Sequence, residues 1–147
     1  MNLKSLLAAA LAASLPLACL AVMPVDPDHA LRKAGSFAIG GVGVAGTMSA
    51  GERALRQTLK QADAVSRLEA MLSTASPAGQ LYILLGLRAR DRAAYERALE
   101  KLRTVDAKVE TARGCIIGQE SFRDLIKQIE HGDYDASLAR EWPERAH

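Results

Sequence analysis

The sequence that decides the fold is SPAGQLYILLGLRARDRAAYERALEKL, residues 76–102. Ser76 and Pro77 predict a helix start, because serine caps a first turn and a proline at the first helical position gives up only an N–H that would have no partner there. The following residues 81–87 are apolar on every side, which predicts a helix buried in the centre of the protein. Asp91 predicts the cap of a second helix, so the stretch is expected to form a helical hairpin.

The second helix of this hairpin is expected to be amphipathic. Its apolar positions follow one another at i, i+3, i+4 and i+7, and they are Tyr95, Ala98, Leu99 and Leu102. Its other face holds opposite charges three or four residues apart, between Arg92 and Arg103, which is typical of a solvated helix surface. One face of this helix is therefore expected to pack against the protein and the other to meet water.

A helix is also predicted before the hairpin. The S-x-x-E pattern from Ser49 to Glu52 is a capping box, in which the serine oxygen accepts from an early helix N–H and the glutamate reaches back to the serine N–H. Apolar residues then continue at spacings of three and four toward Leu72. They fit either one kinked helix or two helices, with Asp63 as the cap of the second.

One more helix is predicted near the C-terminal end. Its apolar stripe consists of Phe122, Leu125, Ile126 and Ile129. Ser121 and Asp124 fit a capping box with aspartate in place of glutamate, and Gly132 fits the residue that ends a helix. Residues 133–147 form a predicted C-terminal tail, which either docks on the domain through its three apolar anchors or stays mobile. The anchors are Tyr134, Leu138 and Trp142.

Two segments favour β-strands. Residues 37–45 are small, apolar and rich in glycine, and residues 108–117 alternate Val109, Thr111, Arg113 and Cys115 on one side. We expect these two segments to pair as a small antiparallel β element. The predicted fold class is therefore mainly α, a single domain of four or five packed helices over residues 36–132 with this small β element.

Residues 1–21 differ from the rest of the chain. They combine one early lysine, a long uncharged apolar run and an end of small residues, which is the pattern of a secretory signal peptide. The pattern predicts export, to the periplasm or to the envelope membrane. Residues 22–35 hold two prolines and show no apolar periodicity, so they are predicted to form a linker.

Two forms of processing fit this signal peptide. Small residues at Cys19 and Ala21 precede Val22, which fits ordinary cleavage after Ala21. Alternatively, Leu17-Ala18-Cys19 resembles a lipobox, in which the cysteine is acylated and becomes the first mature residue, although Pro16 stands where a lipobox usually has leucine. An uncleaved anchor, interrupted by Pro16, is the third interpretation.

The glycines Gly41, Gly43 and Gly46 have the G-x-G-x-x-G spacing of a dinucleotide-binding loop. Such a loop needs a helix that begins within it, and the capping box instead places the helix start at Ser49. It also needs an acidic residue at the end of a second strand, and Asp63 lies in a helical stretch. We therefore expect no nucleotide cofactor and interpret the glycines as a close-packed strand or turn.

Catalytic and metal-binding patterns are sparse in the sequence. The histidines lack a second ligand at i+3 or i+4, so we predict no metal, no cofactor, no catalytic residue and no enzyme activity. The alternative is a small envelope hydrolase or thiol-dependent enzyme that uses Cys115 beside a base such as His131 or Arg113. Because apolar residues follow Cys115, we expect this cysteine to be buried, which disfavours that alternative.

The function that the sequence favours is binding. The formal net charge is +2 and the two signs alternate along the chain, so nucleic acid is not an expected partner. An exported helical domain without a catalytic pattern is typical of a non-catalytic protein-binding or accessory factor with a protein partner in the cell envelope. Tyr134 and Trp142 are the candidate interaction residues, and Trp142 either holds the tail to the domain or anchors the partner. A structural lipoprotein acylated at Cys19 is a further alternative.

Overall fold

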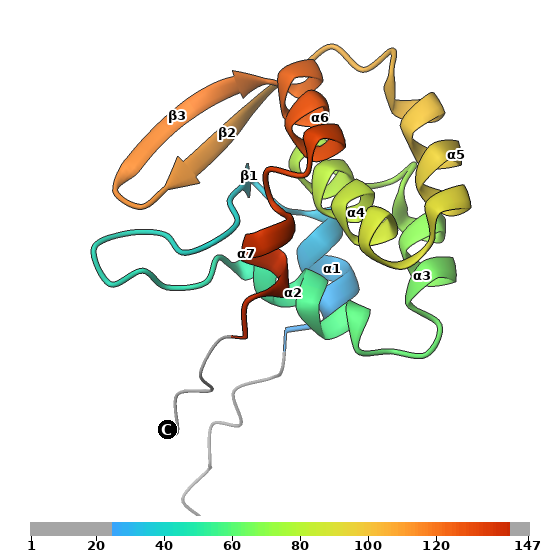
Figure 1. The fold of residues 1–147 in the computed structure, drawn as a ribbon, viewed down its shortest axis with the longest axis horizontal. Coiled ribbons are helices and arrows are strands. Elements are labelled where there is room, and N and C mark those ends of the chain that lie inside the picture. Colours follow the sequence, from blue (N-terminus) through green and yellow to red (C-terminus); the bar gives the residue numbers. More distant parts are fainter. Residues whose placement is uncertain (1–24, 142–147) are drawn as a thin grey trace, which may run out of the picture.

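The computed structural model describes residues 25–141, which form seven helices and one three-stranded sheet. Figure 1 shows the helices gathered into one body, from which a hairpin of the sheet projects. The fold is therefore mainly α with a small mixed sheet. The elements are α1 (Pro27–Arg32), β1 (Ser36–Phe37), α2 (Ala50–Leu59), α3 (Ala64–Met71), α4 (Pro77–Arg90), α5 (Arg92–Leu102), β2 (Lys108–Arg113), β3 (Ile116–Ser121), α6 (Phe122–His131) and α7 (Asp135–Ala139).

The expected number of four or five helices is not confirmed, because the described residues hold seven. Helix α1 lies inside the segment 22–35, which we expected to be a linker, and α7 lies inside the predicted tail. α1 has 6 residues and α7 has 5, which is too short to show a helical period in the sequence. Helix α1 is also packed on the body, because its Leu31 is fully buried.

Helix α4 is the centre of the helical body, as its apolar sequence predicts. Every residue from Leu81 to Leu87 is buried, and the helix contacts α1, α2, α3, α5, α6, β1 and β2 (Figure 1). Ser76 Oγ accepts from the Gly79 N–H at 3.1 Å, so the predicted cap is confirmed. Burial on all sides stabilises the fold by about 1.5–3 kcal/mol for each large aliphatic side chain that leaves water.

Helix α1 packs directly on the start of α4. A Cβ added at Gly79 would lie 2.1 Å from the backbone oxygen of Leu31, so only glycine permits this approach. Asp26 caps α1 by accepting from the Asp28 N–H at 3.1 Å. Arg67 of α3 donates to the Asp28 carboxylate at 2.8 Å, which ties α1 to α3 as well.

Helices α2 and α3 are two separate helices, the second of the two alternatives that the sequence left open. α2 begins after Ser49, whose Oγ accepts from the Glu52 N–H at 3.0 Å. The other half of the predicted capping box is not formed, because the Glu52 carboxylate accepts from Gly40 and Arg56 instead. Asp63 precedes α3, but its side chain makes no capping hydrogen bond.

The sheet differs from the predicted antiparallel element in two ways. β1 contributes only 2 residues, and it pairs with β2 in parallel. The predicted single strand over 108–117 is instead a hairpin, because Gly114 adopts a φ of +56° and the chain reverses there. β2 and β3 then pair antiparallel, and Arg113 lies opposite Ile116 at the turn. In the sequence, the alternation of Val109, Thr111, Arg113 and Cys115 continues past Gly114, so it does not reveal the turn.

Helix α6 packs on α4 and β3 through its predicted apolar stripe, all of which is buried. Gly132 ends this helix with a φ of +87°, as predicted. The predicted cap at the other end is not formed, because the Ser121 side chain makes no hydrogen bond to the first turn. Ser121 is instead the last residue of β3, where it lies opposite Lys108.

The first part of the predicted tail is docked on the body. Tyr134 is buried against Phe37, with ring centroids 5.1 Å apart in an edge-on arrangement. Leu138 of α7 is partly buried against the same core. Trp142 lies outside the described residues. Over residues 25–141, no helix is long and apolar enough to cross a membrane.

Candidate protein-interaction surface

A buried polar network holds the segment that leads from β1 into the glycine-rich loop. The Tyr82 hydroxyl accepts from the Ala38 N–H at 2.8 Å and donates to the Ala38 carbonyl oxygen at 3.0 Å. Ser49 Oγ donates to the same carbonyl oxygen at 2.8 Å. Burial raises the pKa of the Tyr82 hydroxyl, which keeps it protonated and able to donate. The backbone at Ala38 is thus satisfied without a neighbouring strand.

Glu52 and Arg56 couple the glycine-rich loop to α7. Glu52 is fully buried, and its Oε2 accepts from the Gly40 N–H at 2.9 Å. Its Oε1 accepts from Arg56 Nη2 at 2.7 Å and from Nε at 3.0 Å. Arg56 also donates to three carbonyl oxygens at the end of α7, those of Ser137, Leu138 and Arg140. Both charges are satisfied inside the body, so the pair acts as a brace between two segments.

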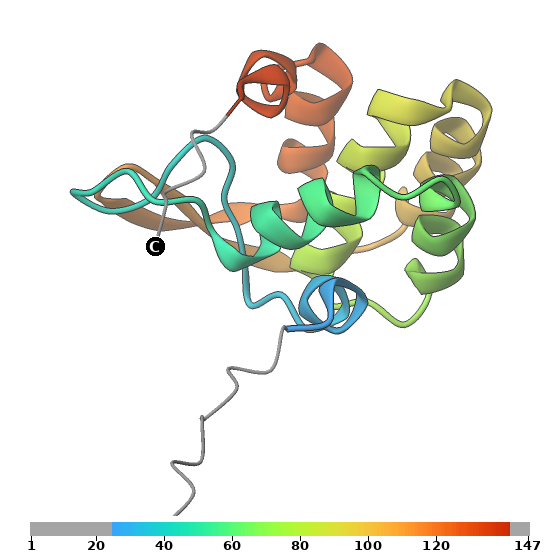
Figure 2. The same ribbon diagram turned by 90° about the horizontal axis from the view of Figure 1, so that it is seen from below.

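Two segments project together from the body, and we call them the arm: the loop of residues 40–47 and the hairpin end of residues 113–118. Figures 1 and 2 show both on the same side of the molecule. Backbone hydrogen bonds join them, from the Gly43 N–H to the Gly114 oxygen at 2.7 Å and from the Gly114 N–H to the Gly41 oxygen at 3.3 Å. The arm is therefore one projection built from two distant parts of the chain.

The three glycines with dinucleotide-loop spacing shape the arm. Gly41, Gly43 and Gly46 all have positive φ, and Gly46 donates to the Gly43 oxygen at 3.0 Å, which closes the turn. Helix α2 begins only at Ala50, beyond these glycines. The N–H groups of Gly43 and Gly46 are taken by carbonyl oxygens of the arm itself, which agrees with the interpretation of this stretch as a turn.

The arm exposes large apolar side chains. Four large hydrophobic residues are exposed within residues 25–141, and three of them belong to the arm: Val44 at 97%, Ile116 at 76% and Ile117 at 71%. Successive side chains of a strand point to opposite faces, so the exposure of both isoleucines leaves both faces of the hairpin end uncovered. Grouped apolar exposure marks a binding surface, whereas single exposed residues are ordinary.

Cys115 lies at the turn of the hairpin and is exposed, so the prediction of burial is wrong. The apolar residues that follow it suggested a core position, but Ile116 and Ile117 are themselves exposed. The thiol-enzyme hypothesis also needs a base beside the sulfur. Of the two bases that this hypothesis names, Arg113 donates hydrogen bonds to Gln128 and Tyr134, and His131 lies in the last turn of α6.

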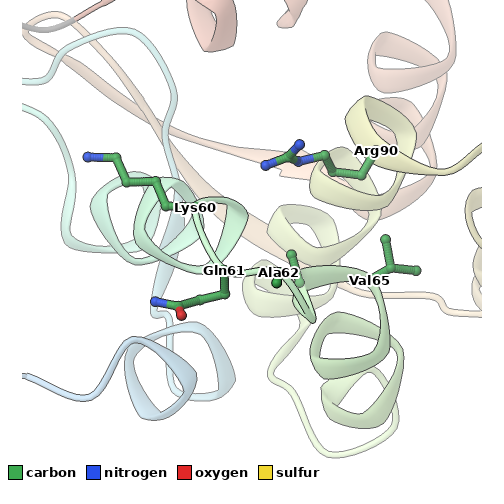
Figure 3. A pocket seen from close by; sticks show the side chains of 6 residues that line it. Lys60, Gln61, Ala62, Val65 and Arg90 are labelled. Atoms are coloured by element: carbon green, nitrogen blue, oxygen red, sulfur yellow. The ribbon is translucent and has the colours of Figure 1, made fainter.

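A surface hollow of about 360 Å³ lies between α2, α3 and α4 (Figure 3). The polar ends of its labelled side chains Lys60, Gln61 and Arg90 lie apart from one another in Figure 3. Arg90 donates to the Leu59 carbonyl oxygen. A ligand site needs convergent polar groups, so this hollow is not our candidate site. In the part of the chain that the structure describes, no group of three or more His, Cys, Asp or Glu residues could hold a metal ion.

The residues that the sequence nominated are not those that the structure brings together. Cys19 and Trp142 lie outside the described residues, and Tyr134 belongs to the core, where burial raises the pKa of its hydroxyl. The apolar residues of the arm were missed. A two-residue turn at Gly114-Cys115 between alternating segments is a hairpin signal that could have placed the two isoleucines at a tip.

Comparison of the chain with protein-family models, with curated proteins and with solved structures finds no match.

Proposed function

We propose that this chain is an exported, non-catalytic protein-binding or accessory factor of the cell envelope, and that the arm is its binding surface. The observation that carries the proposal is the exposure of Val44, Ile116 and Ile117 on one projection. Covering a valine or isoleucine side chain contributes about 1.5–3 kcal/mol, so three of them supply a substantial part of a binding free energy. The braced body beneath holds this projection in place.

Export is supported by the pattern of residues 1–21, which lie outside the described residues. Cleavage after Ala21 would give a periplasmic protein, and acylation at Cys19 would give a membrane-tethered one. Mass spectrometry of the N-terminal peptide of the purified protein separates the two, because the first begins at Val22 and the second carries a lipid on Cys19. A protein that keeps Met1 and stays in the cytoplasmic fraction would contradict export.

The binding proposal is tested by capture of partners from native envelope extract with a C-terminally tagged protein. The decisive variant carries Ile116→Ser and Ile117→Ser, which remove the two exposed apolar side chains without adding a positive charge opposite Arg113. Val25→Ser is the control, because it removes an exposed apolar side chain outside the arm. We expect the double variant to recover at least about tenfold less partner than the wild type and the control. Equal recovery by all three proteins would refute the arm as the surface.

The exposure of Cys115 favours a second candidate function, that of a thiol-dependent enzyme. A catalytic thiol beside a base reacts with iodoacetamide at mildly acidic pH much faster than glutathione does. A rate at least about tenfold above that of glutathione would support this candidate. A rate equal to that of glutathione would contradict it and leave the binding proposal untouched.

A further inference from the structure

The hydrogen-bond pattern of the hairpin sets the direction of each backbone group in β3. Arg113 and Ile116 flank a two-residue turn, so they form a hydrogen-bonded pair, and pairs of this kind alternate along an antiparallel ladder. At the other end of the hairpin the Phe122 N–H donates to the Ala107 oxygen at 2.9 Å, which fits the same alternation. Every second residue of β3, beginning with Ile117, therefore directs its N–H and C=O away from β2.

The outer edge of β3 is open. The sheet order β1-β2-β3 places no strand of the described chain beside the outward groups of Ile117 and Gln119. The opposite edge of the hairpin is covered, since β1 and the Gly41–Gly43 backbone lie along β2. Soluble proteins protect open edges with charge, proline or a bulge, and residues 116–119, Ile-Ile-Gly-Gln, have no charge, no proline and an unbroken register with β2.

The two ends of the hairpin carry opposite charges, so two hairpins paired antiparallel would set ends of unlike charge against each other. Arg113 is at the turn end and Glu120 is near the base, on the same face, because the partner of Arg113 is Ile116, four residues before Glu120. Within one copy their closest approach is a long 3.9 Å, and both side chains are partly exposed. Antiparallel pairing of two copies sets the turn end of one hairpin against the base of the other. Arg113 of each copy then lies on the same face of the joined sheet as Glu120 of the other, with β3 of its own copy between them.

One alignment of two antiparallel β3 strands fits both their backbone groups and their side chains. When Ile117 of one copy lies opposite Ile117 of the other, both are residues with outward backbone groups, as pairing requires. Ile116 then lies opposite Gly118, which leaves room for the isoleucine, and Cys115 lies opposite Gln119. The two Ile117 side chains then lie side by side on one face of the joined sheet.

We infer that the arm binds a second copy of this chain, with the two β3 strands antiparallel in this register. The inference rests on the proposed function, because it names a partner for the same surface. The two sheets join into one, in the order β1-β2-β3-β3-β2-β1, about a two-fold axis at the Ile117 pair. A closed symmetric pairing uses up both open edges, so association stops at the dimer.

The experiment is sedimentation velocity of the purified processed protein over a wide concentration range. Reductant is present throughout, so that a Cys115 disulfide cannot hold two copies together. We expect the wild type to sediment as a dimer. Gln119→Pro removes an outward N–H and leaves the β2–β3 ladder intact, so it should raise the dimer Kd at least about tenfold. Gln119→Ala is the matched control, because it changes the side chain and keeps the N–H. A monomeric wild type, or a dimer that Gln119→Pro leaves unchanged, would overturn the inference.

Cross-linking of Cys115 between the two copies tests the register of the two β3 strands. In the inferred dimer the two Cys115 residues lie four positions apart along the strands, about 14 Å at the usual rise per residue. A bis-maleimide of that reach should link the two copies efficiently. Direct oxidation should not, since a disulfide needs Cα atoms within about 7 Å. Rapid disulfide formation without bis-maleimide linkage would refute this register.

Failure of this inference and failure of the proposed function give different results. A monomeric protein that still captures another envelope protein through the arm refutes self-pairing and supports the proposed function. A dimer that Gln119→Pro disrupts, together with capture of nothing except untagged copies of the chain, supports self-pairing and contradicts a separate partner.

Discussion

Helix α4 and the hairpin end of the arm have apolar sequences of similar character and opposite surroundings. In α4, Ile83 and Leu84 are fully buried, whereas Ile116 and Ile117 in the arm are more than 70% exposed. The difference comes from neighbours, because five helices and the strands β1 and β2 pack around α4 while the hairpin end projects past the body (Figure 2). Covered apolar residues account for stability, and the uncovered ones form the binding surface that we propose.

Glycine has a different role in each of these two regions. Gly79 in α4 allows the backbone of α1 to approach, and its role is to leave space. Gly43 in the arm has open space around it and a φ of +73°, and its role is to turn the chain. The body uses glycine to pack closely, and the arm uses it to project.

The largest expected effect is on the body. Leu84→Ala removes a fully buried side chain from the middle of α4, and we expect it to lower the free energy of unfolding by about 2–5 kcal/mol. Urea denaturation followed by circular dichroism measures the change. A loss below about 1 kcal/mol would show that α4 is not the tightly packed centre of the protein.

The next largest effect is expected at the brace between the arm and α7. Glu52→Ala leaves Arg56 and the Gly40 N–H without their buried acceptor, and we expect a loss of about 2–3 kcal/mol, as for other charge-assisted hydrogen bonds. Glu100→Ala is the control, since Glu100 forms a surface pair with Arg103 of the kind that contributes about 0–1 kcal/mol. Equal losses in the two variants would show that burial gives the Glu52 pair no special weight.

The body was predictable from the sequence to a greater extent than the arm. The caps at Ser49, Ser76 and Asp91 are local, since each needs only a side-chain oxygen and an N–H two or three residues later. The apolar period of α6 is local as well. Such features depend on nearby residues, so the sequence alone reveals them.

The arm depends on contacts between segments about 70 residues apart in the chain. Gly43 and Gly114 join through backbone atoms, which leave no side-chain pattern. Glu52 matched a capping box, but a neighbouring arginine and a distant amide compete for its carboxylate. Ile116 and Ile117 have core chemistry, and only the three-dimensional position of the hairpin shows that nothing in the described chain covers them.

A smaller effect is expected at the hydroxyl of Tyr82. Tyr82→Phe keeps the ring packed against Phe37 but leaves the buried Ala38 N–H without an acceptor, so we expect a loss of about 1–2 kcal/mol. Tyr95→Phe is the control, because no hydrogen bond to the buried Tyr95 hydroxyl is found among the described residues. A Tyr82→Phe protein as stable as the wild type would show that the hydroxyl does not hold the segment after β1.

The same hydroxyl predicts a loss of stability in alkali. Burial raises the folded pKa of Tyr82 above its unfolded value of about 10. The native state then keeps a proton that the unfolded state releases, so the stabilising contribution is complete below pH 10 and declines as the pH rises. The slope is at most about 1.4 kcal/mol per pH unit. Unfolding free energies from pH 9 to 11 should fall less steeply for Tyr82→Phe than for the wild type, and parallel curves would contradict the assignment.

The smallest expected effect on stability comes from shortening an aliphatic side chain in the arm, in contrast to Leu84→Ala in α4. Ile117→Ala should leave the free energy of unfolding within about 0.5 kcal/mol of the wild type at low protein concentration, because the side chain is already in water. If two copies pair as inferred, the wild type should gain stability at high concentration, since association favours the folded state by mass action, and the variant should gain less. The melting temperature of the wild type should therefore rise with concentration more than that of Ile117→Ala.

The deficit of Leu84→Ala should stay constant, because its cause lies within one copy. If Ile117→Ala cost as much as Leu84→Ala at low concentration, the arm would belong to the core and the contrast between the two regions would fail.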